Sequence, residues 1–297
     1  MSKKNEVVNK KVKITKKKKS NFVETMKRLS KSKMAMVGLV IICILILTAL
    51  FAGVIAPYGY AEQDLLNAFQ GPSAKHLFGT DEFGRDIFSR IVYGSRISLE
   101  VGFIAVSISV IIGGLLGAIA GYYGGKTDNI IMRVMDILLS IPQILLAISI
   151  AASLGPGLFN LMIAVGISSI PQYARIVRAS VLSIREQEFI EAARAVGSSD
   201  IRTICKHILP NCLAPVIVQA TLGVAFAILT AAGLSFIGLG ISPPMPEWGA
   251  MLSGGRGYIR DYSYMTLFPG LAIMITILAL NFLGDGLRDA LDPKLKN

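Results

Sequence analysis

Long runs of apolar residues, separated by short polar segments, dominate this 297-residue chain. As helices, these runs are long enough to cross roughly 30 Å of hydrocarbon. The pattern predicts six membrane-spanning helices, at Ala35–Ala56, Leu99–Tyr123, Val134–Ser153, Leu158–Arg175, Leu213–Ile241 and Met265–Leu283. Pro142 and Pro171 interrupt the third and fourth runs, and such prolines kink a membrane helix where neighbouring groups satisfy the freed carbonyls. The expected fold class is all-α and polytopic.

Positive charge is concentrated before the first run. The chain is 53% hydrophobic and has a net charge of +11, which suits a membrane bundle with its charges in the loops. Thirteen of the 30 Lys and Arg residues precede Ala35, and this bias places the N-terminus in the cytoplasm. Six spans place the C-terminus there too. The predicted divisions are a basic cytoplasmic tail at 1–34, a first span at 35–56, an extracytoplasmic segment at 57–98, a five-helix core at 99–283 and a cytoplasmic tail at 284–297.

The Lys-rich N-terminal segment, with four lysines at 16–19, favours contact with anionic membrane lipid. No aromatic residue lies among its lysines before Phe22, which argues against nucleic acid as a partner. The three cysteines, Cys43, Cys205 and Cys212, are scattered and predict no disulfide framework. A metal site at Cys205, His207 and Cys212 would lack a fourth ligand. We therefore predict neither a metal nor a cofactor.

A short polar segment between the fourth and fifth runs has the pattern of two amphipathic helices. The apolar positions of the first fall at Phe189, Ala193 and Val196, and those of the second at Ile201, Ile204, Cys205 and Ile208. Gly197 permits a turn between them, and Pro210 ends the second helix. Ser198, Ser199 or Asp200 is placed to cap it. Such a hairpin either docks a soluble partner or packs only on its own helices.

Charged residues recur before the second apolar run. Asp81 with Arg85, and Asp86 with Arg90, have the spacing of ion pairs on one helix, so we expect an amphipathic helix on the outer membrane surface. A second block, at 243–248, predicts a rigid outer loop in which Trp248 anchors at the membrane interface. Either block could contact a partner or brace the fold.

Residues 120–127 nearly match a phosphate-binding loop, but a membrane helix precedes them and the chain has no soluble domain to bind a nucleotide. The glycines there have another explanation. Gly113, Gly117, Gly121 and Gly125 fall at every fourth position, which lets two membrane helices approach closely. We expect no ATP hydrolysis by this chain.

Ionisable side chains are nearly absent from the depth of the predicted spans. Asp136 is expected to pair with Arg133, one turn away, so the chain offers no proton or ion relay. A small set of uncharged polar side chains remains: Ser107, Ser109, Gln143, Ser168, Ser169, Gln219 and Asn281. These either line a weakly polar passage or make hydrogen bonds between helices.

The hairpin residues resemble the cytoplasmic EAA loop of ABC-importer permeases, the element that docks on the ATP-hydrolysing subunit. The matching positions, within a coupling loop at 185–211, are Glu191, Ala192, Ala193, Gly197, Leu209 and Pro210. His207 departs from the pattern, which commonly has isoleucine there.

Further blocks resemble the second permease of dipeptide, oligopeptide and nickel importers. These blocks lie at 79–99, 124–125, 246–249 and 284–293. The resemblance implies the type I ABC-importer permease fold in a bacterial or archaeal cell membrane. It also implies a heterodimer with a second permease subunit, two ATP-binding subunits and an extracytoplasmic solute-binding protein. It implies no enzymatic activity of this chain's own, because ATP hydrolysis belongs to the partner subunit.

The sequence does not determine which substrate is transported. Peptides are the preferred substrate, and nickel or another small solute is the alternative. Two other classes of function remain: an ion-coupled secondary transporter, which the missing relay disfavours, and a membrane scaffold that recruits a cytoplasmic protein. Copurification of an ATPase subunit would separate the ABC interpretation from both.

Overall fold

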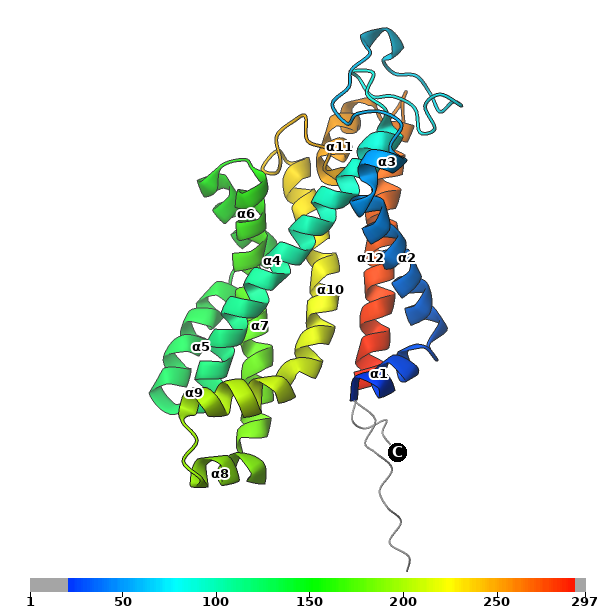
Figure 1. Ribbon diagram of the computed structural model, residues 1–297. Helices are drawn as coiled ribbons and strands as arrows, with labels where there is room; N and C mark the ends of the chain where they lie inside the picture. The colour runs from blue at the N-terminus through cyan, green and yellow to red at the C-terminus, as the bar shows by residue number, and fades with distance from the viewer. Residues whose placement is uncertain (1–20, 292–297) are drawn as a thin grey trace, which may run out of the picture.

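The computed structural model describes residues 21–291 of the chain. The lysine run at 16–19 lies outside the described residues, as do the last six residues of the predicted C-terminal tail. The described part of the chain is a bundle of long helices with shorter helices at both ends (Figure 1). This confirms the all-α class, and an isolated bridge between Thr80 and Asp86 is the only β-pairing within residues 21–291.

The long helices form the body of the bundle. They are α2 (Lys33–Leu50), α4 (Ile87–Tyr123), α7 (Leu158–Arg185), α10 (Leu209–Phe236) and α12 (Tyr264–Leu291). The shorter helices are α1 (Asn21–Leu29), α3 (Ala52–Ile55), α5 (Gly125–Leu139), α6 (Gln143–Leu154), α8 (Glu188–Ala195), α9 (Asp200–Thr203) and α11 (Trp248–Gly255). Three single turns complete the order: 3₁₀ turns at Leu65–Asn67 and Arg256–Tyr258, and a π turn at Ile204–Ile208.

Four helical segments are long and apolar enough to cross a membrane by themselves: α2, α4, the continuous segment Asp200–Phe236, and α12. The pair α5 and α6 passes the same test only together, with a bend of 88° between them. Helix α7, the counterpart of the fourth predicted span, has 28 residues but does not pass, because Asn160, Gln172 and Arg175 make it more polar. Length and composition thus identify four or five of the six predicted spans.

The predicted element boundaries are wrong at two places. Helix α4 begins at Ile87 rather than Leu99, so no separate amphipathic helix precedes it. Residues 57–86 instead form an irregular segment with one 3₁₀ turn. Helix α12 continues to Leu291, so residues 284–291 are not a tail. Packing against α2 requires a glycine at position 286 of this helix, since a Cβ there would lie 2.2 Å from the Cβ of Ala35.

The glycine repeat on α4 brings it against α7. A Cβ at Gly113 would lie 2.6 Å from the carbonyl oxygen of Ile170, and one at Gly117 would lie 2.3 Å from that of Ala174. These separations leave no room for a side chain and confirm the predicted close approach. Gly125 does not belong to this contact, because it opens α5 and faces open space.

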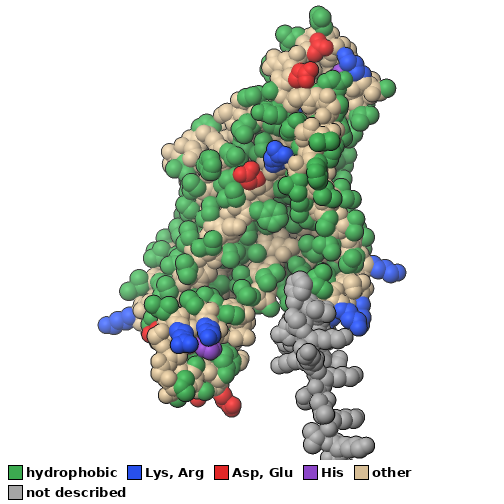
Figure 2. Space-filling model, viewed as in Figure 1, with side chains coloured by type: hydrophobic (Ala, Val, Ile, Leu, Met, Phe, Trp, Pro, Cys, Tyr) green, Lys and Arg blue, Asp and Glu red, His purple; other side chains and the backbone are tan. Residues whose placement is uncertain are grey.

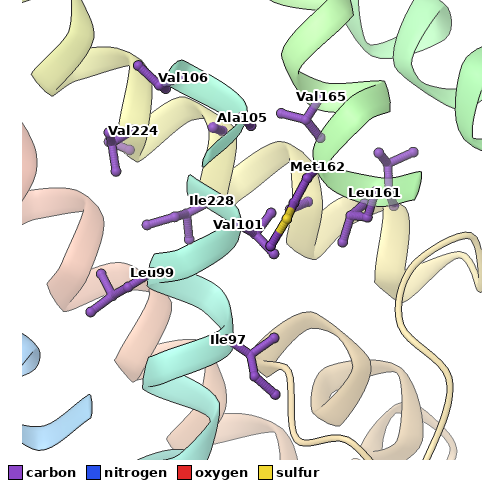
Figure 3. Packing of buried hydrophobic residues seen from close by; sticks show 14 of the residues in the cluster. Ile97, Leu99, Val101, Ala105, Val106, Leu161, Met162, Val165, Val224 and Ile228 are labelled. Atoms are coloured by element: carbon purple, nitrogen blue, oxygen red, sulfur yellow. The ribbon is translucent and has the colours of Figure 1, made fainter. Parts of the chain in front are cut away.

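The main apolar core lies where α4, α7 and α10 meet (Figure 3). Val101 and Ala105 from α4, Met162 from α7 and Ile228 from α10 are all buried there. Close packing of this kind holds the three helices together.

Charged side chains gather towards the two ends of the bundle, and most of the length between is hydrophobic or uncharged (Figure 2). One end carries residues 56–86, which we call the cap, with α11 beside it (Figure 1). The other carries residues 186–208, which we call the hairpin. The candidate site residues lie at these two ends.

Candidate functional site

The first helix of the hairpin, α8, ends as the sequence predicts. Gly197 has φ +83°, a conformation that side chains with a Cβ resist. Its N–H donates to the carbonyl of Arg194 at 2.9 Å, and the N–H of Ser198 donates to that of Ala193 at 3.0 Å. This pair of hydrogen bonds is a Schellman motif, which satisfies the last carbonyls of the helix.

The second helix of the hairpin does not end at Pro210, so that prediction is wrong. Helix α9 passes through the π turn at Ile204–Ile208 into α10, and Pro210 lies in the first turn of α10. Because proline has no N–H, it cannot donate to a carbonyl of the preceding turn, and the helix accommodates it directly after the wider π turn. Figure 1 shows α9 lying across the foot of the bundle, with α10 rising from it. The hairpin is therefore an extension of a long bundle helix.

Two buried isoleucines join the hairpin to the bundle. Ile190 on α8 and Ile208 in the π turn are both fully buried, in one cluster with Val181 and Ile184 of α7 and Cys212 of α10. Ile190 was not among the predicted apolar positions of α8. Its neighbour Phe189, which was, is 41% exposed.

Polar contacts join the hairpin to the end of α4. The Tyr122 hydroxyl donates to Oδ1 of Asp200 at 2.7 Å, and the Arg194 guanidinium lies 5.0 Å from the centre of the Tyr122 ring. Arg185 donates to the carbonyl of Gly121 at 2.8 Å. Ser199 occupies the cap position of α9, but its hydroxyl makes no capping bond.

The tip of the hairpin presents apolar side chains to the outside. Val196 is 85% exposed and Ile201 is 75% exposed, although the sequence pattern assigned both to apolar helix faces. Glu191 is also exposed and has no hydrogen bond or ion pair among the described residues. Of the other predicted loop residues, Ala192 and Pro210 are exposed, whereas Ala193 and Leu209 are half-buried. Exposed apolar side chains gathered on one element are typical of an interaction surface.

In the cap, Asp81 organises a tight turn and a buried ion cluster. Its Oδ1 accepts from the N–H groups of Phe83 and Arg85, and its Oδ2 lies 2.6 Å from Nε of Arg85. Nε of Arg90 lies 3.7 Å from the same oxygen. The predicted pair of Asp81 with Arg85 is present, but it spans a turn rather than a helix. The predicted pair of Asp86 with Arg90 is wrong, because Arg90 faces Asp81.

Asp86 has a different role, as the N-cap of α4. Its Oδ2 accepts from the N–H of Ser89 at 2.7 Å, and its Oδ1 lies 3.0 Å from Nδ1 of His76. Asp86 and His76 are both buried, and the Tyr58 ring stacks on the imidazole. The carboxylate therefore fixes the start of α4 and holds the cap against it.

The second sequence block, at 246–249, packs on the same part of α4. Nε1 of Trp248 donates to the carbonyl of Ile91 at 3.1 Å, and Arg90 donates to that of Pro244 at 3.3 Å. Trp248 is 1% exposed, so the predicted interfacial anchor is wrong: its ring is part of the packed interior. Glu247 caps α11 by accepting from two backbone N–H groups, and burial raises the pKa of its carboxyl.

The cap and the loop before α11 enclose a cavity of about 460 Å³. Its charged lining is Asp81, Glu82, Arg85 and Arg90, and Pro244 and Met245 lie opposite. Burial raises the pKa of the Glu82 carboxyl. The cavity therefore joins two blocks that the sequence analysis treated separately.

Between the two ends, several of the predicted polar residues are hydrogen-bonded within the protein. Ser107 and Ser168 donate to carbonyls of their own helices, and Ser109 also donates across to Gly166 at 2.7 Å. Asp136 pairs with Arg175 of α7 at 2.6 Å, rather than with Arg133 as predicted. Within residues 21–291, no group of three or more His, Cys, Asp or Glu residues is arranged to hold a metal ion.

Comparison with known families decides the assignment. Residues 113–297 match the family described as binding-protein-dependent transport system inner membrane component. The chain belongs to this family. Residues 20–72 match the N-terminal transmembrane domain of oligopeptide transport permease C. The family consists of transport permeases, so this chain is a multi-pass inner-membrane permease rather than an enzyme.

Curated relatives align with nearly the whole chain. The dipeptide transport system permease protein DppC of Alkalihalophilus pseudofirmus is 56% identical over 278 residues, covering 94% of this chain and 91% of the relative. The di/tripeptide transport system permease protein DppC of Pseudomonas aeruginosa is 47% identical, covering 90% of each chain. The glutathione transport system permease protein GsiD of Escherichia coli is 49% identical, covering 92% and 90%.

A solved structure shows the same fold. A chain of the MetNI methionine ABC transporter, in an inward-facing conformation, superposes with a TM-score of 0.55 at 21% identity. The match covers 68% of this chain and 96% of that one. The type I importer fold implied by the sequence resemblance is thereby confirmed.

Proposed function

We propose that this chain forms half of the pathway by which an ABC importer takes up short peptides. The observation that carries the proposal is the 56% identity, over 94% of this chain, to a permease named for dipeptide transport. The relatives named for di/tripeptide and glutathione transport support the same substrate class, since glutathione is itself a tripeptide. Peptide is therefore preferred to nickel as the cargo.

The hairpin is the site at which we infer that a separate ATPase subunit docks. Its tip exposes Val196 and Ile201 beside the unpaired Glu191, while Ile190 and Ile208 fix its base. A force applied at this surface reaches the bundle through the continuous segment Asp200–Phe236. The predicted partners are two ATP-binding subunits here and a second permease subunit along the bundle.

The cap is the site at which we infer that an extracytoplasmic solute-binding protein contacts the permease. This assignment places the hairpin and both termini in the cytoplasm, and the cap outside. In a cysteine-free background, a cysteine at Gly71 should react with an impermeant thiol reagent in intact cells. A cysteine at Ser198 should react only after permeabilisation, and reaction in intact cells would overturn this topology.

Transport by the reconstituted complex tests the function. Proteoliposomes that hold both permeases, both ATPases and the binding protein should accumulate a labelled dipeptide only with ATP on the hairpin side. Uptake should persist when proton and sodium gradients are collapsed. Uptake by this chain alone, driven by an ion gradient without ATP, would contradict the proposal.

A further inference from the structure

Three adjoining cavities run along the bundle, from the break between α5 and α6, past α7 and α10, to the last turns of α7 and α12. They measure about 290, 490 and 660 Å³. Gln143 and Gln172 line both the first and the second, and Gln219 and Leu222 line both the first and the third. The shared lining residues make the three cavities one continuous hollowed face.

Side-chain amides on this face have unused hydrogen-bonding groups. Nε2 of Gln143 donates to Oγ of Ser169 at 2.7 Å, which leaves the Gln143 side-chain carbonyl without a partner. Among the described residues, the side chains of Gln172 and Gln219 have no hydrogen-bond partner at all. Gln172 and Gln219 lie near the middle of α7 and α10, far from either end of the bundle. Gln172 is exposed and Gln143 and Gln219 are half-buried, so their amide groups are free to bond a polar group that enters this face.

The face carries almost no charge. Arg175 lines the 490 Å³ cavity, but Asp136 neutralises it at 2.6 Å. Arg288 lines the 660 Å³ cavity, and no carboxylate within residues 21–291 lines any of the three. A glutamine amide both donates and accepts, which matches the N–H and C=O groups that every peptide unit presents. Among the described residues, Arg288 is then the one fixed charge without an ion-pair partner that side chains of the occupant would meet, and it lies in the 660 Å³ cavity, which Gln143 and Gln172 do not line.

We propose that Gln143, Gln172 and Gln219 bind the main chain of the peptide in transit. The permease would therefore transport peptides with little regard to their sequence. This inference rests on the proposed peptide import. Gln219 is positioned by Tyr173, whose hydroxyl donates to the Gln219 backbone carbonyl at 3.3 Å. Gly223 makes room for that ring, because a Cβ there would lie 2.1 Å from the Tyr173 hydroxyl.

The test compares an amide with an ester in the complete reconstituted complex. The probes are trialanine and its depsipeptide analogue, in which an ester oxygen replaces one backbone N–H. With the binding protein saturated by each probe, the wild type should take up trialanine roughly 2- to 10-fold faster, the range expected for one hydrogen bond. In Gln172→Leu and Gln219→Leu, trialanine uptake should fall and the preference over the ester should disappear. Gln172→Asn and Gln219→Asn should retain part of the preference for the amide.

A matched control and the opposing outcomes complete the design. Thr221→Val removes a hydroxyl on α10 that is already bonded to Ile217, so the preference for the amide should be unchanged. If the leucine variants slow both probes equally, or lose the second permease on purification, the amides face a partner helix and the inference is wrong. If the wild-type complex takes up no peptide at all, the proposed function fails first. Wild-type uptake with the same amide preference in every variant would reject this inference alone.

Discussion

The cap and the hairpin lie at opposite ends of one bundle, and their charged side chains are arranged in opposite ways. In the cap, the ionised groups of Asp81, Arg85 and Arg90 are turned inward and paired. In the hairpin, apolar side chains such as Val196 and Ile201 are turned outward and Glu191 has no partner within residues 21–291. Both ends expose apolar side chains, since Leu66 of the cap is 97% exposed, and both can therefore contact other proteins. The difference lies in the charged groups: pairing within the cap fixes its shape, whereas the Glu191 carboxylate is left for another protein to pair.

The largest effect on stability is expected from breaking the cap's ion cluster. Asp81→Ala would leave the buried Arg90 guanidinium without a carboxylate and Arg85 with only Glu82, 3.6 Å away, and breaking a buried pair in this way costs about 3–5 kcal/mol. We expect a loss of that size in the thermal stability of the purified complex, followed by the reactivity of the buried Cys212 thiol. Glu191→Ala in the hairpin is the matched control and should change stability by less than about 0.5 kcal/mol. Equal effects of the two variants would contradict the comparison.

The glycines at the two ends should respond differently to the same substitution. Gly84 and Gly197 both have positive φ, of +72° and +83°, and asparagine tolerates this conformation better than most residues. A Cβ at Gly84 would lie 1.8 Å from the carbonyl oxygen of Asp64, whereas a Cβ at Gly197 meets nothing within 4 Å. Gly84→Asn should therefore cost about 1–3 kcal/mol through overpacking, and Gly197→Asn much less. The same unfolding measurement would reveal any reversal of this order.

A smaller effect is expected from the pH dependence of Glu247. Burial raises the pKa of this carboxyl above its value in the unfolded chain. The cost of burying the ionised form is complete above the raised pKa and disappears as the pH falls through it towards about 4.5. Between pH 7 and pH 5 the wild type should therefore gain stability relative to Glu247→Gln. The pKa of the Glu82 carboxyl is raised as well, but Glu82 is present in both proteins, so its contribution cancels from the difference in stability. A pH-independent difference would show that Glu247 does not titrate in this range.

The smallest effect on stability, with a large effect on coupling, is expected at the hairpin tip. Ile201→Asp places a charge on a side chain that is 75% exposed, so stability should change by less than about 0.5 kcal/mol. If the tip docks the ATPase, copurification of that subunit and peptide-stimulated ATP hydrolysis should both fall. Lys206→Asp, at an exposed position nearby, controls for the added charge. Normal ATPase binding by Ile201→Asp would show that the tip is not part of the docking surface.

Local rules were enough to predict the glycine contacts and turns. The spacing of Gly113, Gly117 and Gly121 predicted a close approach by another helix, which the structure shows to be α7, and the conformational freedom of Gly197 predicted the turn after α8. These features depend on backbone geometry within a few residues, which follows directly from the positions of the glycines in the sequence.

Partners in tertiary contacts could not be predicted in the same way. Spacing predicted ion pairs of Asp136 with Arg133 and of Asp86 with Arg90. In the structure, Asp136 pairs with Arg175, and Arg90 pairs with Asp81. Each error replaced a contact across the fold with the nearest opposite charge along the chain. Gln172 lies inside the predicted fourth span but was not among the polar residues predicted to line a passage.

The close contact between α4 and α7 also limits how the permease can move. Because the backbones touch at Gly113 and Gly117, the two helices cannot slide or rotate past each other and must travel as one rod. Helices α2 and α12 form a second rod, since a Cβ at Gly38 would lie 2.5 Å from the carbonyl oxygen of Ala279. Helix α10 contacts both rods through side chains such as Ile228, which can change rotamer. The two rods also touch directly, because Arg96 of α4 donates to the carbonyl of Ala49 of α2 at 3.1 Å. A rearrangement that opens a passage is therefore expected between the two rods and at their contacts with α10, rather than within either rod.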